Sequence, residues 1–121
     1  MSLKVSGFSS AAATYKVVSD ADSDSGVETD VTGSGGRIYH IDISNTQATH
    51  TSYVKFKLTA GTVTVGTTEP DMMLVAGPST AQAYEFPSGL AFEQLTYWTT
   101  RNPATSDNTG PNTTILTILC T

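Results

Sequence analysis

The sequence predicts an all-β protein, an antiparallel β-sandwich of the jelly-roll or immunoglobulin-like type with about seven to eight strands. Two segments alternate apolar and polar residues with a period of two, which is the pattern of a half-buried strand. Short β-branched and apolar stretches recur between turns rich in glycine, proline and asparagine. Threonine is abundant, and no segment carries an apolar stripe with helical spacing.

The first alternating segment lies at residues 36–45. Tyr39, Ile41 and Ile43 are expected to face the core, while His40 and Asp42 point to the opposite side. Polar residues 45–52 follow and are predicted to form a connecting loop.

The second alternating segment lies at residues 53–58. Val54, Phe56 and Leu58 are predicted to face inward, and Lys55 and Lys57 are predicted to face water. Residues 62–65 form either an extra strand or an extended loop.

Residues 1–13 are predicted to form an N-terminal arm, and residues 14–121 a single β-sandwich domain. The arm is small and polar, so ordering it needs either its own sheet or another subunit. A strand is expected at residues 14–18. Residues 19–36 are polar and are expected on the surface, either without regular structure or with a short strand at residues 26–31.

Further strands are expected at residues 72–76, 82–86 and 90–100, with turns at residues 77–79 and 87–89. The apolar face switches between Phe92 and Leu95, which predicts a bulge or a corner. Residues 113–120 form a last strand that is apolar on both faces, so it should lie centrally or face a partner chain. The predicted core comprises Tyr39, Ile41, Ile43, Val54, Phe56, Leu58, Leu74, Phe86, Phe92, Leu116 and Ile118.

The composition narrows the range of partners. The net charge is −5 and the six basic residues are dispersed, which argues against nucleic acid. No apolar run approaches the roughly 20 residues that span a bilayer, so no membrane partner is expected. Cys120 is alone, which rules out an intrachain disulfide. It is predicted to be a small buried apolar residue, with a reactive or intermolecular thiol as the alternative.

The sharpest local pattern is the alternation of Asp20, Asp22 and Asp24. Carboxylates at alternating positions suit Ca²⁺, but the calcium-binding loop of an EF-hand also needs glycine at its sixth position and glutamate at its twelfth. Those positions hold Ser25 and Val31. The favoured interpretation is therefore a solvated acidic loop, and calcium binding is the alternative.

Other candidate groups do not form a recognisable site in the sequence. The two histidines lack metal-ligand spacing, the glycines at positions 33, 35 and 36 do not match a phosphate-binding loop, and no nucleophile elbow is present. Four acids could pair as general acid and base in principle. The sequence thus predicts no catalytic, cofactor-binding or metal-ligating residue, no cofactor and no enzyme activity. The groups considered are His40, His50, Gly33, Gly35, Gly36, Glu69, Asp71, Glu85 and Glu93.

Two further features have alternative interpretations. Tyr97 and Trp98 could form an exposed pair that stacks on a sugar or a partner, although packing in the core is favoured. The segment Asn112-Thr113-Thr114 matches the sequon for N-glycosylation, but no secretion signal supports its use.

The order of several segments resembles small virion structural proteins of tailed bacteriophages, especially those of marine and cyanobacterial phages. The segments are Ser44-Asn45-Thr46, Tyr53-Val54-Lys55-Phe56, Val65-Gly66-Thr67-Thr68-Glu69-Pro70, an apolar run with Gly77, Phe86-Pro87-Ser88-Gly89-Leu90-Ala91-Phe92 and Thr105-Ser106-Asp107-Asn108-Thr109. The resemblance covers roughly two-thirds of the chain, by the span of these segments, and excludes residues 1–35.

The resemblance implies a capsid decoration or cement protein that binds the outside of the phage head, made in the host cytoplasm. Its expected partners are the major capsid protein or another virion protein and further copies of itself in a homo-oligomer, with a homotrimer favoured. The alternative is a fibre component or a receptor- or carbohydrate-binding module of the particle. An enzyme would need convergent titratable groups in a pocket, and the sequence offers none.

Overall fold

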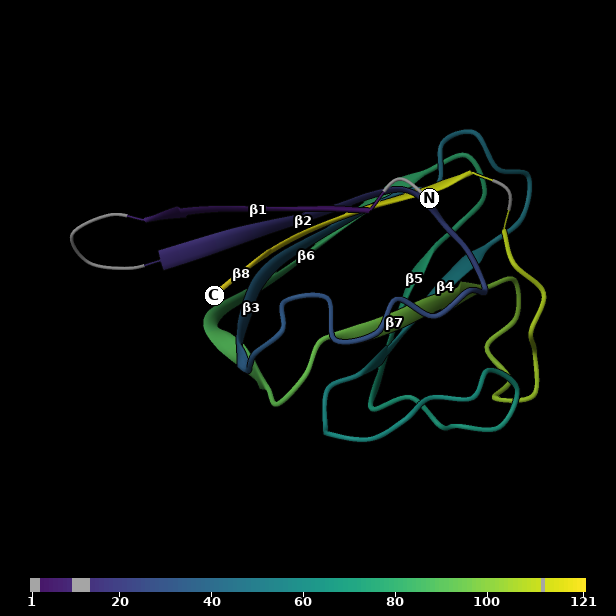
Figure 1. Ribbon diagram of the computed structural model, residues 1–121. Coiled ribbons are helices and arrows are strands. Elements are labelled where there is room, and N and C mark those ends of the chain that lie inside the picture. Colours follow the sequence, from purple (N-terminus) through teal and green to yellow (C-terminus); the bar gives the residue numbers. More distant parts are fainter. Residues whose placement is uncertain (1–2, 10–13, 112) are drawn as a thin grey trace.

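The computed structural model describes residues 3–9, 14–111 and 113–121, and these residues contain strands but no helix (Figure 1). This confirms the predicted all-β class. The strands are β1 (Lys4–Ser9), β2 (Thr14–Ser23), β3 (Gly36–Ser44), β4 (Ser52–Lys57), β5 (Met72–Ala76), β6 (Ala81–Phe92), β7 (Thr96–Thr100) and β8 (Thr114–Cys120).

The strands form two antiparallel sheets. Sheet A has five strands in the order β1-β2-β8-β3-β6, and sheet B has three in the order β5-β4-β7. The core lies between the sheets and includes Ile41 and Ile118 from sheet A and Val54 and Phe56 from sheet B. Because β8 lies between β2 and β3, the central position predicted for the last strand is confirmed.

The segment from Asp24 to Val31 acts as a fourth strand of sheet B. Glu28 exchanges two backbone hydrogen bonds with Tyr97 of β7, at 2.9 and 3.0 Å. On either side, the Thr99 amide donates to the Asp24 carbonyl and the Val31 amide donates to the Leu95 carbonyl. Part of the predicted surface segment 19–36 therefore covers the edge of β7.

With this segment included, the strand order is that of a jelly roll. Counting β2 as the first strand and residues 24–31 as the second, sheet A pairs the first, eighth, third and sixth strands. Sheet B pairs the second, seventh, fourth and fifth strands. Two sheets built this way from eight consecutive strands form the double Greek key of a jelly roll. Strand β1 is an addition to the outer edge of sheet A.

The prediction that Tyr39 faces the core is wrong. Ile38 and Ile41 are both buried, and the pairing of β3 with β6 and β8 shifts between Ile38 and His40. This bulge interrupts the alternation, so Tyr39 is half-buried, and its ring meets that of Tyr15 edge-on at 6.1 Å.

The turn predicted at residues 87–89 lies inside a strand instead. β6 runs from Ala81 to Phe92, and its pairing with β3 jumps from Glu85 to Leu90. The residues between form a wide bulge in which Gly89 has a φ of 79°. Pro87 is accommodated because β6 is an edge strand, where one side of the backbone needs no ladder hydrogen bond.

The corner predicted between Phe92 and Leu95 is confirmed. β6 belongs to sheet A and β7 to sheet B, so the chain crosses between sheets over Glu93 and Gln94. Eight predicted core residues are buried: Ile41, Ile43, Val54, Phe56, Leu58, Phe92, Leu116 and Ile118. Leu74 and Phe86 pack against them half-buried.

Candidate functional site

An acidic corner forms where β2, residues 24–28 and β7 meet. Asp20 lies in β2, is buried and accepts a hydrogen bond of 2.8 Å from the hydroxyl of Tyr97, which is also buried. Asp20 is therefore not in a solvated loop, as the sequence interpretation had it. The pair connects sheet A to sheet B across the interior.

The charges of this corner act on one another. Burial raises the pKa of Asp20, and the hydrogen bonds from the Tyr97 hydroxyl and the Asp22 amide oppose this rise. Burial also raises the pKa of Glu28, and the neighbouring carboxylates of Asp20, Asp24 and Asp22 raise it further. For Tyr97, burial and its bond to Asp20 raise the pKa.

A small pocket opens beside the pair, lined by Asp22, Asp24, Gly26, Val27 and Glu28. Asp22 and Asp24 are exposed, and Asp24 accepts a 2.8 Å hydrogen bond from the Gly26 amide. Within the described ranges, no group of three or more histidine, cysteine, aspartate or glutamate side chains is placed to hold a metal ion. The geometry is that of an acidic turn.

We expect a chelator to leave the protein unchanged. Adding a calcium chelator to the purified protein should shift the melting temperature by less than about 1 °C, because the carboxylates do not converge on one point. Differential scanning calorimetry with and without added calcium measures this. A substantial fall on chelation, restored by calcium and abolished in Asp22→Asn, would contradict it.

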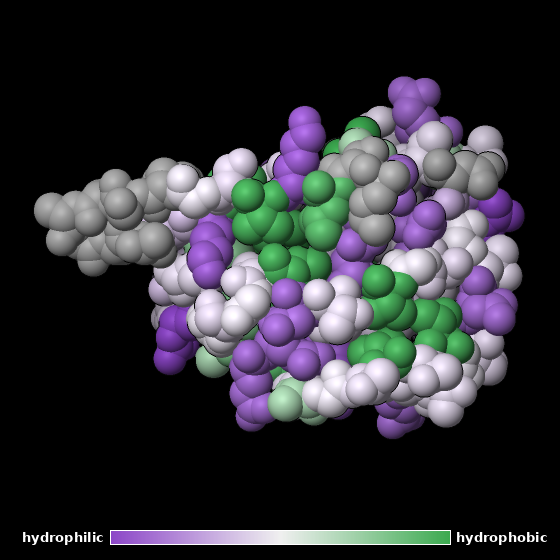
Figure 2. Space-filling model, in the orientation of Figure 1, coloured by the Kyte–Doolittle hydropathy of each residue, from purple (hydrophilic) through white to green (hydrophobic). Residues whose placement is uncertain are grey.

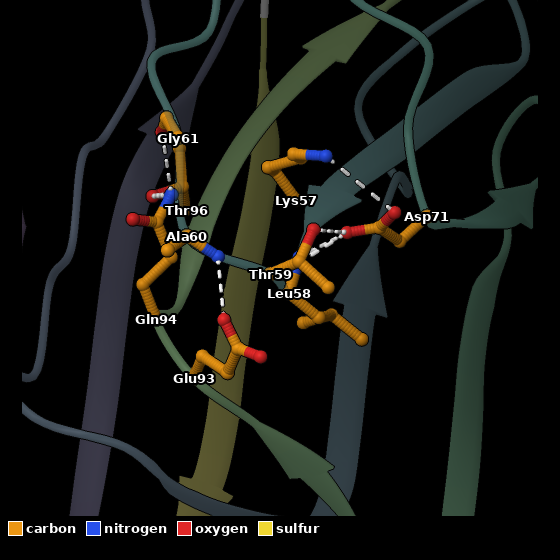
Figure 3. A network of polar contacts seen from close by, with 9 residues as sticks. All are labelled: Lys57, Leu58, Thr59, Ala60, Gly61, Asp71, Glu93, Gln94 and Thr96. Atoms are coloured by element: carbon orange, nitrogen blue, oxygen red, sulfur yellow. Dashed lines mark hydrogen bonds and ion pairs between the residues drawn. The ribbon is translucent and has the colours of Figure 1, made fainter.

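Two of the four candidate acids hold backbone amides instead of forming a catalytic pair (Figure 3). Asp71 accepts hydrogen bonds from the amides of Leu58 and Thr59 and from the Thr59 hydroxyl, at 2.8, 3.1 and 2.9 Å. Glu93 accepts one from the Ala60 amide at 3.0 Å. Burial alone would raise the pKa of Asp71, but these hydrogen bonds and the Lys57 charge lower it.

The other two acids lie elsewhere. Glu69 is exposed in the loop before β5, and Glu85 is exposed on the outer face of sheet A. There, His40 contacts Asp42 at 3.1 Å and Glu85 at 3.6 Å. His50 is half-buried after β3, and its Nε2 atom has no hydrogen bond in the described structure. The four acids therefore do not meet in one site.

The outer face of sheet B is covered by a loop. Lys55 is fully buried, and its ammonium donates a 2.8 Å hydrogen bond to the Ala104 carbonyl in the loop after β7. Burial lowers the pKa of Lys55, and the charge of Asp107 opposes this. The prediction that Lys55 faces water is wrong, because alternation along a strand does not show that the far face is also covered.

Tyr97 and Trp98 do not form an exposed aromatic pair, because both side chains are buried. Trp98 lies opposite Lys55 in the pairing of β4 with β7, and it is buried on this covered face. Tyr97 is buried on the other face, in the core. The favoured interpretation of core packing is right for Tyr97, whereas Trp98 is buried beneath the loop layer.

A buried polar network at one end of the sandwich was not predicted. The Asn45 side-chain amide donates to the carbonyls of His50, Ala76 and Gly77 at 2.8, 3.2 and 2.9 Å. Its carbonyl oxygen accepts hydrogen bonds from the hydroxyls of Ser52 and Thr114. The only sequence signal was an asparagine at a strand end, which is common in turns.

The remaining candidates have structural roles or lie outside the description. Cys120 is buried in the core, as predicted, and burial raises its pKa, which disfavours the reactive thiolate. Gly36 begins β3, and Gly33 has a φ of 72° in the preceding turn. Asn112, the acceptor of the sequon, lies outside the described residues.

Comparisons with protein-family models, with curated proteins and with solved structures found no match for this chain. Among the described residues there is no helix long and apolar enough to cross a membrane.

Proposed function

We propose that this chain is a non-enzymatic structural protein of a bacteriophage particle, a decoration or cement protein that binds the major capsid protein on the outside of the head and stabilises it. The supporting observation is the jelly-roll strand order of sheets A and B. Viral capsid proteins are among the proteins that use this architecture. The resemblance of the sequence segments to phage virion proteins agrees with it.

The two outer faces of the sandwich suggest how it would bind. Sheet B is covered by the loop that receives Lys55, while the outer face of sheet A combines short side chains such as Ser19, Ala83 and Thr117 with the larger polar side chains of His40, Asp42 and Glu85. A broad face that mixes polar and apolar side chains can form many hydrogen bonds with another protein. The outer face of sheet A is therefore the proposed capsid-binding surface.

Add-back to particles that lack the protein tests this surface. Ala83→Arg places a long charged side chain on the outer face of sheet A and should abolish binding to purified heads, measured by co-sedimentation. Ala60→Arg is the matched control, because Ala60 is exposed in the loop after β4. Absence of the protein from purified particles, or binding that Ala83→Arg leaves unchanged, would contradict the proposal.

The alternative is a fibre or a receptor- or carbohydrate-binding module. The observation that favours it is the edge-to-face pair of Tyr15 and Tyr39, both half-buried. Lectins also use jelly rolls. Particles that lack the protein distinguish the two functions. If the protein is a decoration protein, these particles should adsorb normally to the host but resist heat less well. If it is a receptor-binding module, they should fail to adsorb.

A further inference from the structure

Three of the four edges of the two sheets are protected. Exposed strand edges carry unpaired backbone groups that can pair with another chain, and proteins block them with prolines, bulges or covering groups. β6 carries Pro87 and its wide bulge. β7 is covered by residues 24–31. On β5, the hydroxyl of Tyr84 accepts from the Val75 amide at 3.2 Å and donates to its carbonyl at 2.6 Å.

Among the described residues, the fourth edge, β1, carries no proline, bulge or covering group, and its one charged side chain is Lys4. Its pairing with β2 is regular from Lys4 opposite Ser19 to Ser9 opposite Thr14, without a bulge or a proline. Residues Lys4, Val5, Ser6 and Gly7 are exposed. The free side of this strand is therefore open to a further strand.

β1 also extends beyond the cover of sheet B. Val5 lies opposite Val18 and on the same face, yet Val18 is fully buried and Val5 is 43% exposed. The hairpin of β1 and β2 projects from the body of the molecule (Figure 1), and Figure 2 shows exposed apolar residues in green beside it. An added strand would cover part of this apolar surface.

The hairpin is held to the rest of the molecule through β2. Lys16 of β2 donates hydrogen bonds of 3.3 and 3.4 Å to the Thr32 carbonyl and the Ser34 hydroxyl. This contact joins the hairpin to the segment before β3. A strand that is already fixed loses less conformational entropy when it pairs.

We propose that β1 pairs antiparallel with β1 of a second copy of this chain, across a two-fold axis at Ser6. The axis is perpendicular to the sheet, so the core-facing sides of the two copies lie on the same face of the joined sheet. Each residue therefore pairs with a residue whose side chain points to the same face. Ser6 then lies opposite Ser6 of the second copy, Val5 opposite Gly7, and Lys4 opposite Phe8. The two copies of sheet A become one continuous sheet.

This register suits the side chains. Each Val5 lies opposite a glycine, which leaves room above the strand, and the two Val5 side chains are diagonal neighbours on one face. Centring the axis on Val5 would pair fewer residues. Centring it on Gly7 would place Val5 opposite Ser9 and separate the two valines.

The charge distribution favours a second copy as the occupant. Two molecules with a net charge of −5 repel each other, but residues 1–19 contain Lys4 and Lys16 and no acid. Contact through β1 therefore joins the molecules at the end that carries no carboxylate. The two Lys4 residues lie about 14 Å apart along the strands, further than the screening length of about 8 Å at physiological salt.

Matched lysine substitutions test the contact. Val5→Lys places two cations beside the axis and should raise the dimer dissociation constant about tenfold or more, measured by sedimentation equilibrium. Ile115→Lys is the control, because Ile115 has the same 43% exposure but lies on β8, away from the β1 edge. At low concentration, where the proteins are monomeric, both variants should have the circular dichroism spectrum and the melting temperature of the wild type.

A cysteine substitution tests the register. Ser6→Cys should form a disulfide-linked dimer under mild oxidation, because the two side chains face each other at the axis. Ile115→Cys should stay monomeric on a non-reducing gel, and the native Cys120 is buried. A wild-type protein that is monomeric at all concentrations, or a dimer or trimer that Val5→Lys leaves intact, would overturn the proposal. The pairing of β1 with β1 does not depend on the proposed phage function. It produces a dimer with two-fold symmetry, whereas the resemblance implies a trimer.

Discussion

Phe56→Ala should lower the free energy of unfolding by about 3–5 kcal/mol, the range for removing a large aromatic side chain from a core. Phe56 is fully buried in β4, the central strand of sheet B. Its ring lies 6.2 Å from that of Tyr97, in a tilted arrangement. Removing the ring loses apolar burial and leaves a cavity at the centre of the sandwich. Urea unfolding followed by tryptophan fluorescence measures the change.

Ile115→Ala is the control for this prediction. Ile115 lies on β8 but is partly exposed to solvent, so its truncation should change the free energy of unfolding by about 0.5 kcal/mol or less. A loss below about 1 kcal/mol in Phe56→Ala would mean that the sheets do not pack on each other through this residue.

Much of the fold follows from local pattern. A period of two identified β4 and most of β3, and turn residues separated the strands between residues 72 and 86. The switch of parity after Phe92 predicted the crossing between sheets. These signals work because one buried face imposes alternation on a strand wherever the backbone stays regular.

Bulges and second layers are what the pattern missed. The bulge beside Ile38 moves Tyr39 out of the core, and nothing in the alternation signals it. Lys55 was predicted to face water because alternation shows only that one face of a strand is apolar. It does not show whether the opposite face is covered by another part of the chain. The loop that covers it comes from residues far along the chain. Which loop covers which face depends on the tertiary fold.

The acidic corner was only partly visible in the sequence. The alternation of Asp20 and Asp22 drew attention to this segment. The segment was nevertheless predicted to be a loop, because aspartate is rare in strands. Tyr97, the partner of Asp20, lies 77 positions away along the chain. Long-range pairs of this kind need the fold before they can be recognised.

The Asp20–Tyr97 pair gives the second large expected effect. Tyr97→Phe should lower the free energy of unfolding at pH 7 by about 1.5–3 kcal/mol, the range for a hydrogen bond to a charged group. The substitution removes the donor and leaves the carboxylate of Asp20 buried between the sheets. Tyr53→Phe, at a half-buried tyrosine of β4, is the control and should have little effect.

The pH dependence separates the charge of Asp20 from the loss of a hydroxyl. The pKa of Asp20 is raised above 3.8 in the folded state, mainly by burial, so the folded protein holds this proton more tightly than the unfolded chain. The stability that protonated Asp20 contributes is complete below the unfolded pKa and is lost as the pH rises through the folded pKa. Asp20→Asn keeps an acceptor for Tyr97 but cannot ionise.

Asp20→Asn should therefore gain stability relative to the wild type as the pH rises from 3.8 towards 7, and Tyr97→Phe should cost less in this background than in the wild type. Urea unfolding of the four proteins of this double-mutant cycle, at pH 4 and pH 7, measures both effects. An equal cost of Tyr97→Phe with Asp or Asn at position 20 would show that the hydroxyl and the carboxyl contribute independently. The polar link between the two sheets would then rest on contacts other than this hydrogen bond.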